Sequence, residues 1–322
     1  MKRSFGCAAA MLALCGAAPV LAADYLVAPG TELRPAYPEA WEDAIRFEFG
    51  TAYWYSMGGQ DASFASPFGD ISLAVRDQTH IGELNGKIED LSTQTYLAAR
   101  AGLGFHTSGT YEISPASSGD IGNDSRIGYA GADFGWLPLG DMREGAAFGG
   151  FVGYQYWKDA PDIGTGQYAT DFDAGFTPTE LGDAQDDFDI HALRLGVKAA
   201  ADFDMFDIQA EVAAVPYAQV TGTLGGSSPG GFDVGGVTVN ENEPTTLSGR
   251  GYGIMAETMV GYHPTDSLTV RVGGRAWYLE GELDAVFNGT AEGGGELAEL
   301  TLPSTYASLF RYGLLAELTG KF

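Results

Sequence analysis

Hydrophobic and polar residues alternate with a period of two along much of the chain, which is typical of β-strands whose two faces meet different surroundings. The last segment, residues 304–322, shows the pattern most completely. One face carries Tyr306, Phe310, Tyr312, Leu314, Ala316, Leu318 and Phe322, and the other carries Thr305, Arg311, Glu317, Thr319 and Lys321. A strand of this kind is expected to turn its apolar face to lipid and its polar face to an aqueous lumen.

The same alternation predicts ten strands, and the second is the weakest because its alternation is nearly all polar. They are expected at residues 44–57, 74–88, 92–106, 126–137, 146–158, 188–200, 205–220, 248–262, 267–281 and 304–322. The connections alternate strictly between short turns and long segments rich in Gly, Pro, Ser and acidic residues. Outer-membrane barrels have this arrangement, with short periplasmic turns and long outer loops.

These features predict an all-β fold, namely a closed antiparallel transmembrane β-barrel of about ten strands, with eight or twelve strands as alternatives. An unpaired strand edge is costly in hydrocarbon, so the first and tenth strands are expected to pair. A soluble β-sandwich would also alternate, but it would explain neither the asymmetry of the connections nor the aromatic residues near both ends of the strands. Beyond the first two dozen residues, no apolar run is long enough for a membrane helix.

The N-terminal residues 1–22 are expected to form a cleaved signal peptide, with Lys2 and Arg3 before an apolar, Ala-rich stretch. A lipoprotein signal ending at Cys15 is the alternative, although Leu14 stands where a small residue is usual. Residues 23–43 are then a periplasmic segment and residues 44–322 the barrel. Cys7 and Cys15 both lie in the signal, so neither a disulfide nor a cysteine metal site is expected in the mature chain.

The chain is strongly acidic, with a formal charge of −26. Nucleic acid is therefore excluded as a partner. The expected partners are the lipid and lipopolysaccharide of a bacterial outer membrane and the barrel assembly machinery, which would read the terminal Phe322. Basic peptides and divalent cations are further candidates, and no organic cofactor is expected.

The polar face of the predicted strands carries charges of both signs. They are Arg46, Glu48, Arg100, Asp133, Arg194, Lys198, Asp207, Glu211, Glu257, Arg271, Arg275, Arg311 and Glu317. Two interpretations are open, a selective pore or proton path and a salt-bridged plug. The plug is favoured because the two signs are interleaved and wide aqueous channels generally need more strands.

The outer loops are acidic, and residues 160–188 contain no Lys or Arg. Two groups in this region could supply hard oxygen ligands to a divalent cation. They are Asp171 with Asp173, and Asp183 with Asp186 and Asp187. No spacing matches a calcium-binding loop, so a solvated acidic surface is the alternative.

Candidate catalytic groups are few, because the chain has four histidines. His106 is the best-placed general base, since alternation puts it on the inward face at the outer end of a strand. Asp189 and His191 form a carboxylate and imidazole pair on one side of a strand. The parity of that strand points His191 to lipid unless a β-bulge changes the register.

Local segments resemble the omptins, the ten-stranded surface proteases of Gram-negative outer membranes. They are Gly150-Phe151-Val152-Gly153-Tyr154-Gln155, Phe203-Asp204-Met205-Phe206 and Gly261-Tyr262-His263-Pro264-Thr265. The resemblance implies a ten-stranded barrel with an Asp-x-Asp pair on the second outer loop and an Asp-x-His pair on the fourth. Here the second loop, 107–125, has no Asp-x-Asp, and the fourth, 221–247, has no histidine.

The sequence therefore favours a structural or ligand-contacting barrel that is not an enzyme. An omptin-like hydrolase of peptide or lipid is the first alternative, and a narrow channel is the second.

Overall fold

The computed structural model describes residues 44–65, 70–114, 117–142, 145–162, 167–169, 178–180, 187–224, 232–234, 237–241, 245–291 and 297–322. They all belong to one compact unit, Glu42–Phe322. The predicted signal peptide, 1–22, and the N-terminal segment, 23–43, lie outside the described residues and stay predictions. No helix in the described part of the chain is long and apolar enough to cross a membrane.

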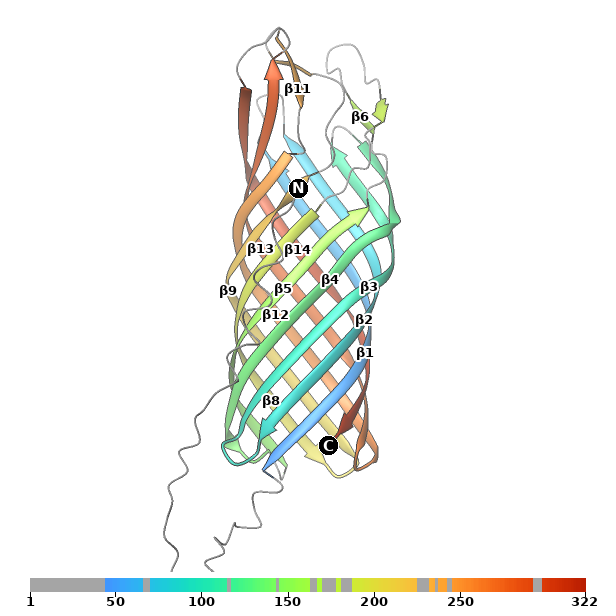
Figure 1. Ribbon diagram of the computed structural model, residues 1–322, viewed down its shortest axis with the longest axis vertical. Helices are drawn as coiled ribbons and strands as arrows, with labels where there is room; N and C mark the ends of the chain where they lie inside the picture. Colours follow the sequence, from blue (N-terminus) through green and yellow to red (C-terminus); the bar gives the residue numbers. More distant parts are fainter. Residues whose placement is uncertain are drawn as a thin grey trace, which may run out of the picture. The chain divides into compact units, whose positions relative to one another are not determined.

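Ten long strands form a closed antiparallel ring (Figure 1). They are β1 (Ile45–Phe64), β2 (Ile71–Asp90), β3 (Thr95–Ser114), β4 (Ser117–Gly140), β5 (Ala146–Asp162), β8 (Asp187–Phe203), β9 (Phe206–Leu224), β12 (Thr245–Thr265), β13 (Leu268–Ala291) and β14 (Leu297–Lys321). Each pairs with its neighbours in sequence order, and β1 pairs with β14 from Glu48 and Lys321 upward. The predicted fold, with ten strands and a seam between the first and the last, is confirmed.

Four short strands lie at the outer end of the ring. β6 (Gln167–Ala169) and β7 (Pro178–Glu180) pair with each other, while β10 (Phe232–Val234) and β11 (Val237–Glu241) extend the sheet next to β13. Figure 1 shows the long strands tilted and the C-terminus at the opposite end, where the tight turns lie.

The long strands extend well beyond the lengths that the lipid pattern predicts. They contain 17 to 25 residues, whereas about 9–11 residues are enough to span a bilayer. The loops expected at 107–125 and 281–303 are therefore largely wrong, since β3 reaches Ser114, β4 starts at Ser117, and β13 reaches Ala291. Outside the bilayer both strand faces can be polar, so apolar alternation no longer marks the strand.

The turns at the other end are short and have local causes. Between β8 and β9, Asp204 has a φ of 51°, a conformation that Asp tolerates better than most residues. Between β2 and β3, Asp90 Oδ1 accepts hydrogen bonds from the Ser92 hydroxyl at 2.5 Å and the Ser92 amide at 2.8 Å. These two bonds lower the pKa of Asp90 to about 2.

The distribution of polarity is reversed relative to a soluble protein. Large apolar side chains such as Leu314, Val272 and Leu195 are exposed on the outer surface, while charged groups such as Arg311 and Asp133 are buried inside. An exposed apolar surface around a polar interior is what a transmembrane barrel requires. The predicted assignment of faces holds for most of each strand and changes beyond several β-bulges.

One bulge lies in β14, at the seam with β1. Ser63 pairs with Tyr306 and Phe64 with Ser304, so the inward position predicted for Thr305 is wrong and its side chain is exposed. Two further bulges decide the positions of other predicted lumen residues.

The first bulge lies where β2 meets β3, and the second lies in β9. His80 pairs with His106 and Ile81 with Gly104, so Phe105 is the additional residue. In β9 the consecutive residues Pro216 and Tyr217 are both exposed, and the inward face passes from Val215 to Ala218. A bulge inserts one residue and exchanges the two faces of the strand beyond it.

Candidate functional site in the barrel lumen

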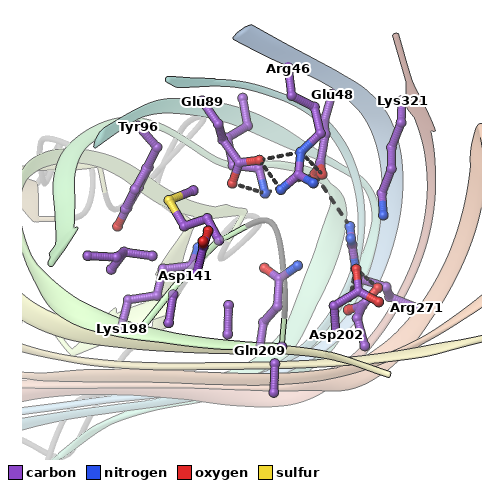
Figure 2. A pocket seen from close by; sticks show the side chains of 18 residues that line it. Arg46, Glu48, Glu89, Tyr96, Asp141, Lys198, Asp202, Gln209, Arg271 and Lys321 are labelled. Carbon is purple, nitrogen blue, oxygen red and sulfur yellow. Dashed lines mark hydrogen bonds and ion pairs between the residues drawn. The ribbon is translucent and has the colours of Figure 1, made fainter. Parts of the chain in front are cut away.

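The lumen is filled by layers of side chains, and the lowest layer lies next to the turns. Lys87 Nζ lies 3.0 Å from Glu48 and 2.9 Å from Glu89, and Arg46 lies 2.5 Å from Glu89. Figure 2 shows Arg46, Glu48 and Glu89 close together at the wall of a cavity that Lys87 also lines and that has about 50 Å³ of space for solvent. Acidic and basic groups both line this cavity, so the lining selects neither for cations nor for anions by its charge.

Arg271 joins this layer to the opposite wall. Its Nε donates to Asp207 at 2.9 Å and its Nη1 donates to Glu317 at 2.9 Å. Lys198 lies 3.6 Å from Glu211 and covers the Tyr96 ring at 5.1 Å. These contacts connect the lowest layer to the next one above it.

The middle layer contains three arginines that share carboxylates from facing strands. Arg194 lies 2.9 Å from both Asp133 and Glu211. Arg100 lies 3.1 Å from Glu211 and 2.8 Å from Glu257. Shared carboxylates link strands that are far apart in the ring, because β3 and β12 are not neighbours.

Arg275 occupies the centre of this layer. Its guanidinium donates to Glu83 at 2.7 Å and Glu257 at 2.5 Å, and Tyr129 also hydrogen-bonds Glu83. Its Cζ lies 5.1 Å from the Trp54 ring centroid and 5.9 Å from that of Trp277. Aromatic faces attract a cation, and this attraction is greater where water is excluded.

Packed aromatic rings surround Arg275 and separate the middle layer from the upper one. Trp157 packs edge-on against Trp277 at 4.9 Å and stacks with Tyr129 at 5.5 Å. Trp54 contacts both, with its ring centroid 5.2 Å from that of Trp277. The rings occupy the axis of the barrel at this level.

The upper layer is centred on Arg311, which is completely buried. Its two Nη atoms donate to the Asp77 carboxylate at 2.9 and 2.8 Å, and Nη2 also donates to Asp159 at 3.4 Å. Ser56 accepts a further bond at 3.2 Å. A two-pronged arginine contact of this kind is among the stronger charge pairs in proteins.

Every charged side chain assigned to the lumen from the sequence takes part in at least one of these ion pairs. The sequence interpretation missed five further members of the network. They are Asp77, Glu83, Lys87 and Glu89 on β2, and Asp159 on β5. The four on β2 share one parity, which was the available signal, and Asp159 was assigned to a loop because the strand was ended one residue too early.

His106 does not point into the lumen, and the inward position expected for it is wrong. The bulge at Phe105 exchanges the faces of β3, so His106 is exposed on the outer surface with its ring 5.5 Å from that of His80. Tyr53 hydrogen-bonds His80 there at 2.6 Å. A general base acting inside the barrel therefore gains no support from His106.

Asp189 and His191 lie on the outer side of β8, as the parity of the strand indicates. Tyr156 hydrogen-bonds Asp189, and Tyr154 hydrogen-bonds His191 Nδ1 at 2.5 Å. Ile190, between them in sequence, is buried in the lumen. The two groups thus bind separate tyrosines on the outer surface and do not act as a hydrogen-bonded pair.

Of the proposed metal ligands, Asp187 is described, and it pairs with Lys158 and, at 3.4 Å, with Arg126. Asp171, Asp173, Asp183 and Asp186 lie outside the described residues. Within the described ranges, no group of three or more potential ligands is close enough to hold a metal ion.

The ring of ten strands, the apolar outer surface and the charged interior define a transmembrane β-barrel of the outer-membrane type. Among solved structures, the chain is similar to the outer membrane protease OmpT from Escherichia coli, with a TM-score of 0.60 and 10% identity over 87% of this chain and 97% of that one. This likeness confirms the predicted omptin-like architecture. At such low identity it shows the fold and not the activity.

A second structure, the translocator domain of the autotransporter NalP from Neisseria meningitidis, aligns with a TM-score of 0.34 and 11% identity over 87% of this chain and 88% of that one. No family model matches the sequence, and no curated protein sequence does so either.

Proposed function

We propose that the chain is exported to the bacterial outer membrane and acts there as a closed, non-conducting barrel that supports acidic, ligand-contacting outer loops. The observation that carries the proposal is the middle layer of the lumen. Arg275 is held at its centre by two carboxylates and by aromatic rings. The gap beside it, lined by Arg100, Gln155 and Met255, has no room for a water molecule.

Charge pairing supports a closed state at three levels. A permeating ion would have to separate buried pairs such as Arg275 with Glu83, or Arg311 with Asp77, whose side chains are at most 2% exposed. Breaking a buried pair leaves an uncompensated charge, which costs about 3–5 kcal/mol. The described residues therefore favour a plug over a conducting path.

The outer loops supply the ligand-contacting part of the proposal. Residues 160–188 contain acidic residues and no Lys or Arg, and the whole chain has 43 acidic against 17 basic residues. A surface of this charge attracts divalent cations and basic peptides and repels other anions.

The proposal predicts that the purified barrel, refolded into a planar lipid bilayer, produces no conductance steps. A matched variant combines Trp54→Gly, Trp157→Gly and Trp277→Gly with Arg275→Ser and Arg311→Ser, which removes three of the axial rings and the central cations of the middle and upper layers. This variant is expected to conduct, because both layers are then wide enough for water and the lowest layer already has space for solvent.

The opened variant also shows that silence of the wild type is not a failure of insertion. Both proteins are first checked on a denaturing gel, where the unboiled and boiled samples of a folded barrel migrate differently. The proposal would be overturned, and a channel favoured, if the wild type produced conductance steps as frequent and as large as those of the variant.

A further inference from the structure

Above the Arg311 layer the interior of the barrel changes from charged to apolar. The inward positions of β1, β2, β8, β9, β13 and β14 carry aliphatic or aromatic side chains there. Around one cavity they are Ala62, Leu73, Phe188, Ile190, Ala218, Val220, Leu279, Leu283, Ala307 and Leu309. This apolar chamber has about 70 Å³ of space for solvent and is partly open.

The chamber exists because the inward residues at this level are small. Ala62, Ala218 and Ala307 are buried alanines that line the cavity from three strands. Larger residues at the same positions would fill the space. The cavity is therefore encoded by side-chain size and not by a gap between strands, which are paired on both sides.

Several polar residues also border the chamber, but their side chains point outward. Asp61 pairs with Arg76 on the outer surface at 2.6 Å, and Glu280 accepts a hydrogen bond from Tyr278 there at 2.7 Å. Arg250 is likewise exposed on an outward position of β12. The lining is consequently hydrocarbon, with Gln60 as the inward polar side chain at its edge.

The chamber is closed from below and from the sides. Its floor consists of Ile190, Leu279 and Leu309, which pack in the same buried cluster as Trp157. Arg311, which covers the Trp157 ring at 5.0 Å, closes the lumen at that level. The continuous ring of paired strands separates the chamber from the bilayer, so a ligand enters from the outer end.

We propose that this chamber binds the terminal part of an unbranched alkyl chain that arrives from outside the cell. An apolar cavity offers water few hydrogen-bond partners, so a hydrocarbon group is preferred there. A cavity of about 150 Å³ accommodates benzene; the smaller chamber of this barrel fits a narrower chain of a few methylenes. The inference goes beyond the proposed function, because it does not depend on whether the lumen conducts.

The test uses the full barrel in lipid nanodiscs, with alanine methyl groups labelled with ¹³C and n-alkanols of four to ten carbons as probes. The Ala62 and Ala307 methyls report on the chamber, whereas the Ala316 methyl faces lipid and reports on partition into the bilayer. Saturable shifts are expected at the alanines that line the chamber, Ala62, Ala218 and Ala307, and not at Ala316. The dissociation constant should fall about fourfold for each added methylene, until the chain fills the chamber.

Two substitutions make the test specific to the chamber. Ala307→Leu fills the space and should abolish the saturable shift at Ala62, while Ala316→Leu, on the lipid side of the same strand, should leave it unchanged. If Ala307→Leu does not fold, Ala62→Leu serves the same purpose from β1, with Ala307 as the reporter.

Unsaturable shifts that match those of Ala316 would overturn the inference, because they indicate partition into lipid alone. Magnetisation transfer to Ala62 from a side chain of this protein that is not part of the lining, with no response to alkanol, would also overturn the inference, because it would show that another segment of the protein fills the chamber. A conducting wild-type barrel would refute the proposed function and leave the alkyl site intact.

Discussion

Arg311 illustrates how a single residue is committed to the interior of this barrel. It is fully buried, and all the acidic groups that it contacts, Asp77 and Asp159, are also buried. Its inward direction follows from the alternation of 304–322. The identity of its partners does not follow from alternation, because they lie on β2 and β5. Alternation predicts the face on which a residue lies, but it does not predict which strands meet across the lumen.

We predict that Arg311→Met lowers the free energy of unfolding by about 3–5 kcal/mol, because Asp77 and Asp159 are left buried without a cation. Adding Asp77→Asn should recover part of the loss, since one of the uncompensated charges is removed. The measurement is urea-induced unfolding in lipid vesicles, followed by tryptophan fluorescence.

The control for this prediction is Arg76→Met. Arg76 precedes Asp77 in the chain and pairs with Asp61 on the outer surface, where the two side chains are 54% and 39% exposed. Exposed pairs contribute roughly 0–1 kcal/mol, so a small effect is expected. If Arg311→Met and Arg76→Met lowered the free energy of unfolding by the same amount, burial would not explain the effect of Arg311.

Single elements show where period-two alternation succeeds and where it fails. In β9, alternation correctly puts Asp207 and Glu211 in the lumen and Ile208 and Val212 outside. It fails for Gln219, which has the same parity as Asp207 and Glu211 but is exposed, because the bulge at Pro216 exchanges the faces. His106 was misplaced for the same reason. Counting alternation assumes one unbroken register, so it puts every residue beyond a bulge on the wrong face.

We predict that deletion of Pro216 is tolerated, with a change in unfolding free energy of no more than about 1 kcal/mol, in the range of ordinary surface changes. Against β12, Val215 and Ala218 enclose two residues where the partner strand has one, and against β8 the same holds for Ala214 and Tyr217. Removing the extra residue regularises the pairing and keeps Val215 and Ala218 inward. Proline has no backbone N–H, so the deletion removes no hydrogen bond that this residue donates.

Deletion of Gln209 is the matched control, because it removes one residue from a regular part of the same strand. This deletion would turn Glu211 toward lipid and leave Arg194 and Arg100 without that carboxylate. The Gln209 deletion should prevent folding, so unboiled and boiled samples should migrate alike on a denaturing gel. A folded Gln209 deletion, or an unfolded Pro216 deletion, would contradict the assigned role of the bulge.

At the scale of the whole molecule, the sequence predicted the ring better than it predicted the contents of the ring. The ring follows from local patterns that each strand repeats, such as the alternation and the tight turn at Asp204. The apolar chamber does not follow from local patterns, because it requires small residues of different strands, such as Ala62, Ala218 and Ala307, to lie at the same height in the barrel. That coincidence is set by the tilt and register of the closed barrel, which are global quantities.

Phe322 extends the paired seam between β14 and β1 by one residue pair. Phe322 and Phe47 exchange two backbone hydrogen bonds, of 2.9 and 3.1 Å, at the turn end of the seam between β14 and β1. The Phe322 side chain makes little contact with the barrel and is 82% exposed. The backbone of Phe322 therefore contributes to the folded structure, whereas its ring contributes little to it.

We predict that Phe322→Ala leaves the stability of the refolded barrel in vesicles nearly unchanged, because both backbone bonds remain, yet sharply reduces the amount of folded protein in the outer membrane of cells. Deletion of Phe322 should impair both, since the bonds to Phe47 are lost as well. The measurements are urea unfolding for stability and gel mobility of membrane fractions for assembly. Normal assembly of Phe322→Ala would show that the ring is not the signal, and the sequence prediction for Phe322 would then be wrong.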